Sequence, residues 1–338
     1  MQDTFEINGR SVGRQQPCFV IAEAGVAHFG SLEKAKKLVD LAVEARADAV
    51  KFQIFDVDRM ISSAAQDWKN RMKSRCLGFF EFEEVKSYCE TRRITFLATP
   101  HDEAGLSMLG KLSVPAYKIG SGELGNPEFI RKILDIGLPV IISTGMYSTG
   151  DLDAVVELCR QSGNERIALL HCVTQYPTPP EEAKLSRLSR LREKFEGVVG
   201  YSDHTIGTHI PLVAVGLGAK VIEKHISLDF DVPDAQDWKV SCGPETFCEF
   251  VQQIREIEKS MDHTYEILAE AESENRLWAC KSLVLTRGHL AGEILQESSV
   301  TAKRPGTGIT PSKKSEVLGR KLNKEKEFDS VLHWDDVI

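Results

Sequence analysis

The stretch CFVIAEAG, residues 18–25, is a short apolar run that carries one carboxylate, Glu23, near its C-terminal end. Seven similar runs follow it, each separated from the next by an amphipathic stretch. In order, the eight runs are Cys18–Gly25, Ala49–Phe55, Ile94–Pro100, Ala116–Ser121, Pro139–Gly145, Ile167–Val173, Val198–Thr205 and Lys220–Leu228. Eight alternating units of this kind are typical of a (β/α)8 TIM barrel, whose active site is built from the strand C-termini. The competing fold is a flat doubly wound sheet, and the spread of polar ends over nearly all the runs favours the barrel.

The polar residues at these ends are more numerous than a purely structural barrel would need. They are Glu23, Lys51, Gln53, Thr99, Lys118, Ser121, Ser143, Thr144, His171, Ser202, His204, Glu223 and His225. Between the runs, apolar side chains recur at helical spacing in Leu32–Ala45, Asp151–Gln161 and Pro244–Met261. Repeated βα units with short connections imply parallel strands with right-handed crossovers.

Composition indicates an ordinary globular protein. The chain has 338 residues, of which 42% are hydrophobic and 27% are charged. No apolar run approaches the roughly 18 residues of a membrane helix, and the N-terminal residues lack the apolar core of a signal peptide, so we expect a cytoplasmic protein that does not bind a membrane. The net charge of −8 argues against nucleic acid as a partner. The eight cysteines include no C-x-x-C pair, so neither disulfides nor a cysteine zinc site is expected.

The composition changes near residue 281, where the chain becomes rich in strand and turn signals. We therefore predict a barrel domain over residues 1–261, a linker or exposed helix over 262–281 and a small β-rich module over 282–338. A module of this size buries little apolar surface by itself, so it is expected to pack on something larger.

Two histidines form the strongest candidate site. His204 lies in GYSDHT of the seventh run and His225 in VIEKHI of the eighth, so parallel pairing places their imidazoles close together at the barrel mouth. Neutral imidazoles bind divalent transition metals, and two protein ligands leave coordination positions for water and substrate. The alternative is a pair of hydrogen-bonded structural histidines, which the nearby Glu223 makes less favourable.

Residues two apart on a strand share a face. Lys51 therefore faces the same way as Gln53, Ser202 the same way as His204, and Glu223 the same way as His225. Unpaired charges would be costly on the helix-facing side, so we interpret Lys51 and Lys118 as an anion site. Hydroxyl donors for that site come from Ser121 and Ser143, and neighbouring glycines let an anion approach the backbone. Structural salt bridges are the alternative role for the two lysines.

Three further residues lie in loops. Tyr176 follows the sixth run in a proline-rich loop, where it either contacts a polyol substrate or packs the loop. Asp237 occupies a comparable position after the eighth run. Arg304, in KRPGTG of the C-terminal module, is either a surface arginine or a guanidinium that reaches a substrate.

Taken in order, the motifs resemble those of a known family. FVIAEAGVAHFGSL, AVKFQ, YKIGSGE, ISTGM, LLHCVTQYPTPPEE, GYSDHT, VIEKH and AKRPGTG resemble the sialic acid synthases, which include bacterial N-acetylneuraminate, legionaminate and pseudaminate synthases. The resemblance runs from about residue 4 to the C-terminus, and the last 57 residues resemble the antifreeze-like (SAF, β-clip) domain of those enzymes. The family pattern often has Asn where this chain has Ala27. The chain also has Thr174 where some members have Asn, and an unusual loop over 231–241.

The resemblance implies a transferase that condenses phosphoenolpyruvate with the open-chain form of an N-acylated amino sugar, N-acetylmannosamine or a diacetamido-hexose. The products would be a nine-carbon 2-keto-3-deoxy acid and phosphate. By this resemblance, Mn2+ (or Mg2+ or Co2+) held by His204 and His225 would polarise the aldehyde and orient the attacking water. The implied catalytic residues are Glu23, His204, Glu223 and His225. The implied phosphoenolpyruvate-binding residues are Lys51, Thr99, Lys118, Ser121, Ser143 and Ser202, and the implied sugar-binding residues are Gln53, Tyr176, Asp237 and Arg304.

The resemblance also implies a domain-swapped homodimer, in which Arg304 would reach the barrel of the other subunit. Two other functions are compatible with parts of the pattern. One is a Schiff-base sugar aldolase with Lys118 or Lys51 as nucleophile, which the histidine pair argues against. The other is a non-catalytic sugar-binding protein, which the combination of Glu23 with the lysines and histidines disfavours.

Overall fold

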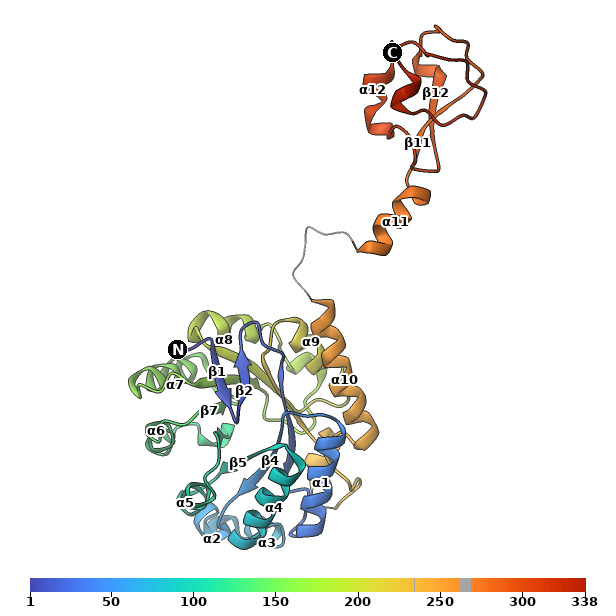
Figure 1. Ribbon diagram of the computed structural model, residues 1–338. Coiled ribbons are helices and arrows are strands. Elements are labelled where there is room, and N and C mark those ends of the chain that lie inside the picture. The colour runs from blue at the N-terminus through green and yellow to red at the C-terminus, as the bar shows by residue number, and fades with distance from the viewer. Residues whose placement is uncertain (234, 262–268) are drawn as a thin grey trace. The chain divides into compact units, whose positions relative to one another are not determined.

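The computed structural model describes residues 1–233, 235–261 and 269–338 (Figure 1). The chain divides into two compact units, Met1–Asp262 and His263–Ile338, and each is described here by itself. Part of the predicted linker, residues 262–268, lies outside the described residues. The rest of it is mostly helical, because α11 spans Glu270–Ala279.

The first unit is a nearly closed barrel of eight parallel strands, which confirms the predicted TIM barrel. The strands are β3 Phe19–Gly25, β4 Ala49–Ile54, β5 Thr95–Pro100, β6 Tyr117–Ile119, β7 Val140–Ser143, β8 Ile167–Cys172, β9 Val198–Asp203 and β10 Val221–His225. Their order is β5-β4-β3-β10-β9-β8-β7-β6, and the two outer strands lie against each other. Because all eight strands run parallel, their C-termini meet at one end of the barrel.

Helices cover the outside of the barrel. They are α1 Leu32–Glu44, α2 Val57–Met60, α3 Gln66–Lys73, α4 Phe79–Arg92, α5 Glu103–Leu112, α6 Pro127–Asp135, α7 Thr149–Gln161, α8 Arg187–Phe195, α9 His209–Gly216 and α10 Pro244–Ser260. Short 3-10 helices are η1 Ser63–Ala65, η2 Ser121–Glu123, η3 Pro180–Glu182 and η4 Asp237–Val240. None of the helices in the described residues is long and apolar enough to cross a membrane.

The start of α7 shows how local side chains define a helix end. The sequence predicted a helix from Asp151, but the helix begins two residues earlier, at Thr149. Ser148 accepts a hydrogen bond from the backbone N–H of Asp151, and the Asp151 carboxylate accepts one from the backbone N–H of Ser148. This reciprocal capping satisfies N–H groups that the first helical turn leaves free.

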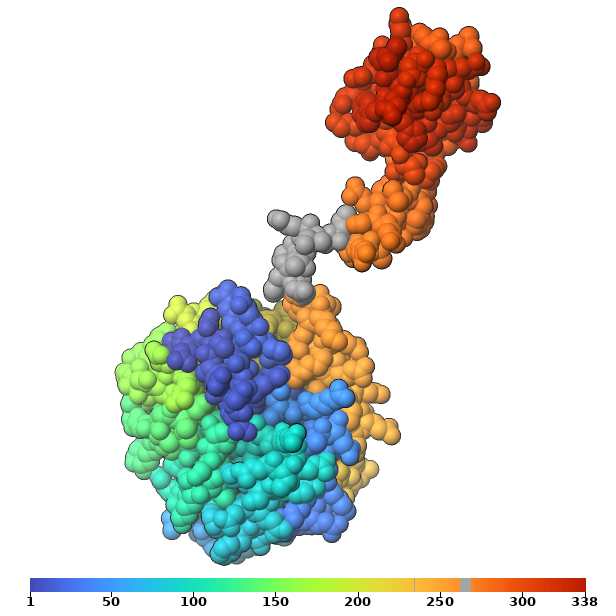
Figure 2. Space-filling view, in the orientation of Figure 1, coloured from blue at the N-terminus to red at the C-terminus, as the bar shows by residue number. Residues whose placement is uncertain are grey.

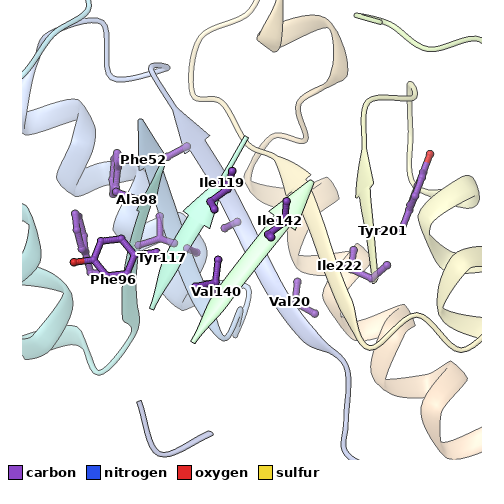
Figure 3. Packing of buried hydrophobic residues seen from close by; sticks show 14 of the residues in the cluster. Val20, Phe52, Phe96, Ala98, Tyr117, Ile119, Val140, Ile142, Tyr201 and Ile222 are labelled. Carbon is purple, nitrogen blue, oxygen red and sulfur yellow. The ribbon is translucent and has the colours of Figure 1, made fainter. Parts of the chain in front are cut away.

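Strand alternation sorts the side chains into two layers. Residues such as Val20, Phe52 and Ile222 point outward and pack between the strands and the helices (Figure 3). Their neighbours Ile21 and Val221 point inward to the barrel interior. Near the strand C-termini the inward positions change from apolar to polar residues, so the same alternation that builds the core also faces polar groups toward the barrel mouth.

An N-terminal hairpin closes the opposite end of the barrel. Its strands, β1 Thr4–Ile7 and β2 Arg10–Gly13, pair antiparallel. Phe5, Ile7 and Val12 are buried among the inward residues of the first halves of the barrel strands. Figure 2 shows this segment in dark blue on the surface of the unit. This hairpin was not among the elements predicted from the sequence.

The second unit contains α11 and a small β structure. Strands β11 Ser282–Leu285 and β12 Val300–Lys303 pair antiparallel. The remaining helical segments are η5 Glu297–Ser299, η6 Pro311–Lys313, α12 Lys314–Val317 and η7 Trp334–Asp336. A small apolar core gathers side chains from along the module: Leu283, Leu285, Leu295, Val300, Ile309, Val317, Leu322, Leu332 and Val337. These features agree with the predicted β-rich module.

Candidate active site

A cavity of about 640 Å3 opens where the barrel strands end. Every predicted site residue of the barrel contributes to its wall. They are Glu23, Lys51, Gln53, Thr99, Lys118, Ser121, Ser143, Tyr176, Ser202, His204, Glu223, His225 and Asp237. These residues come from the inward-facing positions of seven strands and from the segments that follow β6, β8, β9 and β10.

The floor of the cavity is a network of buried charges. Lys51 Nζ lies 2.8 Å from Glu23 Oε2 and 3.7 Å from Glu223 Oε1. Lys118 Nζ lies 3.7 Å from the other oxygen of Glu223, Oε2. Each ammonium also donates to a hydroxyl, Lys51 to Thr99 Oγ1 at 3.1 Å and Lys118 to Ser143 Oγ at 2.7 Å. Glu223 thus lies between the two lysines, and Ser202 Oγ donates to it at 3.1 Å.

Burial and charge act against each other in this network. Burial would raise the pKa of Glu223, but Lys118 and Lys51 outweigh it and hold the pKa below its usual value. Burial dominates for Glu23, whose pKa is raised although Lys51 lies beside it. Burial also lowers the pKa of Lys118, against the opposing effect of Glu223. Neighbouring carboxyl groups of different pKa are suited to different roles in proton transfer.

His204 and His225 lie side by side, with ring centroids 5.2 Å apart. His204 Nδ1 lies 2.7 Å from the carbonyl oxygen of Val173. Since a carbonyl oxygen can only accept, Nδ1 carries the proton and a neutral His204 has its lone pair on Nε2. The Tyr176 ring packs on His204 with 4.1 Å between centroids. The pKa of His225 is lowered well below its usual value by burial and by His204, so that ring is neutral at pH 7.

This donor set fits a metal ion bound by two imidazoles. Two imidazoles that ligate one ion through nitrogens at about 2.1 Å place their ring centres about 5 Å apart, close to the 5.2 Å observed. Over residues 1–233, 235–261 and 269–338, no group of three or more His, Cys, Asp and Glu side chains is arranged to hold a metal. An ion at the pair would therefore complete its coordination with water and substrate oxygens.

The predicted sugar-binding side of the cavity begins at Gln53. Its Nε2 donates to Glu23 Oε1 at 3.2 Å. Gly25 lies directly against these groups: a Cβ added there would approach Gln53 Nε2 and Glu23 Oε1 to 3.3 Å and Asp237 Oδ2 to 3.6 Å. Gly25 also has a φ of +52°, which glycine adopts without strain. The absence of a side chain at this position leaves room for the three polar groups to meet.

Two polar residues of the predicted strand ends do not face the cavity. Thr144 Oγ1 donates to the carbonyl of Leu170 at 2.9 Å, and His171 Nε2 lies 2.7 Å from the carbonyl oxygen of Ala183. Both belong to the layer between barrel and helices, because strand alternation turns them outward. For these two positions the interpretation of every polar strand end as a mouth residue was wrong.

Other residues of the cavity wall were not predicted from the sequence. Trp68, Arg71, Met72 and Arg75 come from α3 and the turn after it, and His101 follows β5; all five line the cavity wall. Cys172, which ends β8, also lines it, with Sγ 3.7 Å from His204 Nδ1. The α3 segment has no apolar periodicity that would have marked it as part of the barrel.

Arg304 belongs to the second unit, where it is exposed. Its loop is held firmly, because Ser282 Oγ donates to the carbonyl of Pro305 at 2.6 Å and accepts from the N–H of Gly308 at 2.8 Å. The N–H of Gly306 donates to the carbonyl of Leu277 in α11 at 2.8 Å. The guanidinium is thus presented on an ordered loop.

Comparisons with known proteins agree with this geometry. The model of the NeuB family matches residues 38–266, and the model of the SAF domain matches residues 281–338. The chain belongs to the NeuB family. It carries a C-terminal SAF domain, and the resemblance to sialic acid synthases described above is confirmed.

Relatives of this NeuB-family chain align over nearly its full length. An uncharacterised protein of Methanocaldococcus jannaschii is 39% identical, covering 99% of this chain and 99% of the relative. The N,N'-diacetyllegionaminic acid synthase of Campylobacter jejuni is 36% identical, covering 93% of this chain and 98% of the relative. The crystal structure of N-acetylneuraminic acid synthetase from Leptospira borgpetersenii, in complex with citrate, superposes with a TM-score of 0.76 at 33% identity, covering 81% of this chain and 95% of that one.

Proposed function

We propose that this protein condenses phosphoenolpyruvate with the open-chain form of an N-acylated amino sugar, N-acetylmannosamine or a diacetamido-hexose. The products are a nine-carbon 2-keto-3-deoxy acid and phosphate. The observation that carries the proposal is the cavity floor, where Glu223 lies between Lys51 and Lys118 and precedes His225 by two residues. The similarity to synthases of such acids supports it.

The lysines and hydroxyls of the floor bind phosphoenolpyruvate. Lys51 and Lys118 supply two ammonium groups, and Thr99 and Ser143 already contact them. Ser121 Oγ accepts from the N–H of Gly145 at 2.9 Å, which aims its own O–H away from that bond. Charge-assisted hydrogen bonds from buried ammonium groups to phosphate and carboxylate oxygens hold the substrate in one orientation.

Glu23 handles the proton of the new hydroxyl group. In the reaction, C3 of phosphoenolpyruvate bonds to the aldehyde carbon, the aldehyde oxygen gains a proton, water adds at C2 and phosphate leaves. Burial raises the pKa of Glu23, which favours the protonated carboxyl form that can give a proton to the new hydroxyl group. Glu223, whose pKa is lowered mainly by its lysines, stays ionised and orients them.

His204 and His225 hold a divalent metal ion in this proposal, with Mn2+ the preferred ion and Mg2+ or Co2+ the alternatives. When bound, such an ion supplies a Lewis acid that polarises the aldehyde and orients water. The chain's own contribution is orientation: the carbonyl of Val173 fixes the ring of His204, and Tyr176 packs over it. Gln53, Tyr176 and Asp237 face the sugar. Arg304 contacts the sugar from the other subunit of a domain-swapped dimer.

A substrate panel tests the proposal. The full-length protein with Mn2+ and phosphoenolpyruvate is offered N-acetylmannosamine and diacetamido-hexoses. Phosphate release and the mass of the organic product are measured together. A nine-carbon keto acid formed in equal amount with phosphate supports the proposal. Phosphate without a condensed acid, or neither product with any sugar of the panel, contradicts it.

One observation favours a second function, a Schiff-base aldolase. Burial lowers the pKa of Lys118, and a neutral amine is the form that attacks a carbonyl. Treatment with borohydride in the presence of substrate distinguishes the two functions. A stable adduct on Lys118 found by mass spectrometry supports the aldolase, and its absence together with phosphate release supports the condensation.

A further inference from the structure

One residue of the cavity wall, His101, is not used by the proposed mechanism. It directly follows β5 and lines the cavity. The inward side chains of β5 include Leu97 in the barrel interior and Thr99 at the cavity. Because alternate residues share a face, His101 continues this series two residues beyond Thr99. It therefore lies one layer above the floor, next to the residue whose hydroxyl accepts a hydrogen bond from Lys51.

Backbone contacts hold His101 in place. Its N–H donates to the carbonyl oxygen of Ile54 at 3.1 Å, so the pairing of β5 with β4 extends to this residue. The next residue, Asp102, accepts from two N–H groups at the start of α5, at 2.7 and 2.8 Å. A Cβ added to Gly120, which also lines the cavity, would lie 3.7 Å from Cε1 of the His101 ring and 3.6 Å from Cγ2 of Thr99. Cε1 lies between the two ring nitrogens, so this edge of the ring adjoins the cavity wall at Gly120.

The two ring nitrogens of His101 have no partner in the described part of the chain. Neither forms a hydrogen bond or an ion pair there, and the ring meets Phe55 edge-on with 6.2 Å between centroids. Burial, followed by the positive charges of Lys51 and Lys118, lowers the pKa of His101 to about 4. The ring is therefore neutral at pH 7 in the free protein, with one N–H donor and one acceptor nitrogen. A substrate that displaces water from this ring must replace the lost hydrogen bonds, because an unsatisfied buried donor costs free energy.

His101 also lines a second, smaller hollow of about 330 Å3. The charged side chains that line this hollow, among the described residues, are Asp102, Glu103, Glu128, Arg59 and Lys132. Lys132 pairs with Glu103 at 2.7 Å and with Glu128 at 3.3 Å. Three carboxylates against two cations do not attract an anion. An anion that reaches the imidazole therefore comes from the cavity, where Lys51 and Lys118 supply positive charge.

From these observations we infer that His101 is a further phosphoenolpyruvate-binding residue, whose imidazole N–H donates a hydrogen bond to an anionic oxygen of this substrate. The inference rests on the proposed function and adds a donor from the same strand end as Thr99. A ring N–H supplies this hydrogen bond without a third ammonium group in the cavity. The competing role is structural, in which the ring only packs on Phe55 and forms part of the wall of both hollows. That role predicts lower stability without a selective effect on phosphoenolpyruvate.

The experiment compares three variants of the full-length protein with Mn2+. His101→Phe keeps a ring against Phe55 but has no N–H, and His101→Gln keeps an N–H donor. Lys132→Met is the matched control, because it removes a charge from the second hollow and does not line the cavity. Calorimetry gives Kd for phosphoenolpyruvate, initial rates give KM for each substrate, and thermal unfolding measures stability.

We expect His101→Phe to raise Kd and KM for phosphoenolpyruvate about tenfold, since a hydrogen bond to a charged group is lost. His101→Gln should recover most of this loss. KM for the sugar should stay near the native value in both variants, and Lys132→Met should bind phosphoenolpyruvate as the native protein does.

The possible outcomes separate this inference from the proposed function. A native Kd in His101→Phe refutes the inference and leaves the condensation standing. A loss of the same size in His101→Gln or Lys132→Met, or an equal rise in KM for the sugar, also refutes it, because these results assign the effect to structure. If the native protein binds phosphoenolpyruvate but forms no condensed acid with any sugar, the condensation fails and the Kd values alone decide the role of His101. If the native protein does not bind phosphoenolpyruvate, both are overturned.

Discussion

The ammonium group of Lys224 lies 2.6 Å from the carboxylate of Asp203, and neither side chain is exposed to solvent. The pair lies behind the cavity, on the outward faces of β10 and β9. Lys224 also donates to the carbonyl of Thr205 at 2.7 Å, and Asp203 accepts from the Thr205 hydroxyl at 2.9 Å. The strand neighbours of these two residues are cavity residues, so the pair fixes the spacing of the two strands that carry the histidines.

Removing one partner of this pair should destabilise the barrel strongly. Asp203→Ala leaves a buried ammonium unpaired, which costs about 3–5 kcal/mol in the free energy of unfolding. The exposed pair of Lys36 and Glu84 is the control, since Glu84→Ala should cost less than about 1 kcal/mol. Thermal unfolding measures both. A loss in Asp203→Ala no larger than in Glu84→Ala would show that the buried pair is not structurally important.

The histidine pair should be needed for metal binding and for condensation. His204→Ala and His225→Ala should each abolish product formation and reduce bound Mn2+, measured by metal analysis, while circular dichroism stays that of the native protein. His209→Ala is the control, because this exposed histidine does not line the cavity. Full activity after exhaustive treatment with a chelator would contradict the metal site.

Lys51→Met and Lys118→Met should impair the use of phosphoenolpyruvate more than the use of sugar. Each ammonium supplies charge-assisted hydrogen bonds worth roughly 1.5–3 kcal/mol, so kcat/KM for phosphoenolpyruvate should fall by about tenfold or more. Lys36→Met, at a half-buried lysine outside the cavity that pairs with Glu84, controls for loss of charge. The assignment fails if initial-rate kinetics show an unchanged KM and kcat for phosphoenolpyruvate.

Stability should fall as the pH drops below about 6.5. Burial lowers the pKa of His28, His101 and His171 to about 4 in the folded protein, whereas an unfolded histidine takes up its proton near pH 6.5. Between these values the unfolded state binds more protons, so each residue removes up to about 1.4 kcal/mol of stability per pH unit. His28→Leu should make the decline of unfolding free energy from pH 6.5 to 4 less steep. An equally steep decline in His28→Leu would contradict this account.

Arg304 should act on the sugar, in trans. Arg304→Ala should raise KM for the sugar while phosphoenolpyruvate binding persists, because its guanidinium is proposed to contact the sugar alone. Mixed dimers of Arg304→Ala and His204→Ala should regain part of the native activity, since some of their composite sites are intact. No recovery after subunit exchange would argue against the swapped arrangement, and native kinetics of Arg304→Ala would remove this residue from the site.

The barrel and most of its cavity could be predicted because each polar residue is encoded next to an apolar strand. Lys51 and Gln53 are two apart, so a single strand assignment places both. The two strand-end residues that were wrongly assigned to the cavity, Thr144 and His171, are explained by the same strand alternation. His171 lies one residue before the end of its strand, whereas His225 is the last residue of its own. Whether such a side chain points inward or outward depends on strand register, which a single sequence does not define.

The α3 residues of the cavity wall were missed for a different reason. Arg71 lies in a helix inserted between β4 and α4, and nothing in its local sequence relates it to the strands beneath. The N-terminal hairpin has four residues in each strand, and its turn is the dipeptide Asn8-Gly9, with a positive φ at both residues. Asn-Gly is a strong local signal for such a turn, so this hairpin could have been predicted from the sequence. Its apolar side chains are buried only because they fill the open end of the barrel. Only the place of each segment on the barrel depends on contacts between residues distant in sequence.

The hairpin has a practical consequence for handling the protein. The N-terminal residues lie at the end of the barrel opposite to the cavity. A purification tag or fluorescent label attached to Met1 is therefore kept away from incoming substrate. Shortening the chain by its first 13 residues is a different matter, because Phe5, Ile7 and Val12 are nearly inaccessible to solvent in the folded protein. Without these side chains, the end of the barrel opposite to the cavity would be open to water. A shortened form of the protein should therefore begin no later than Thr4.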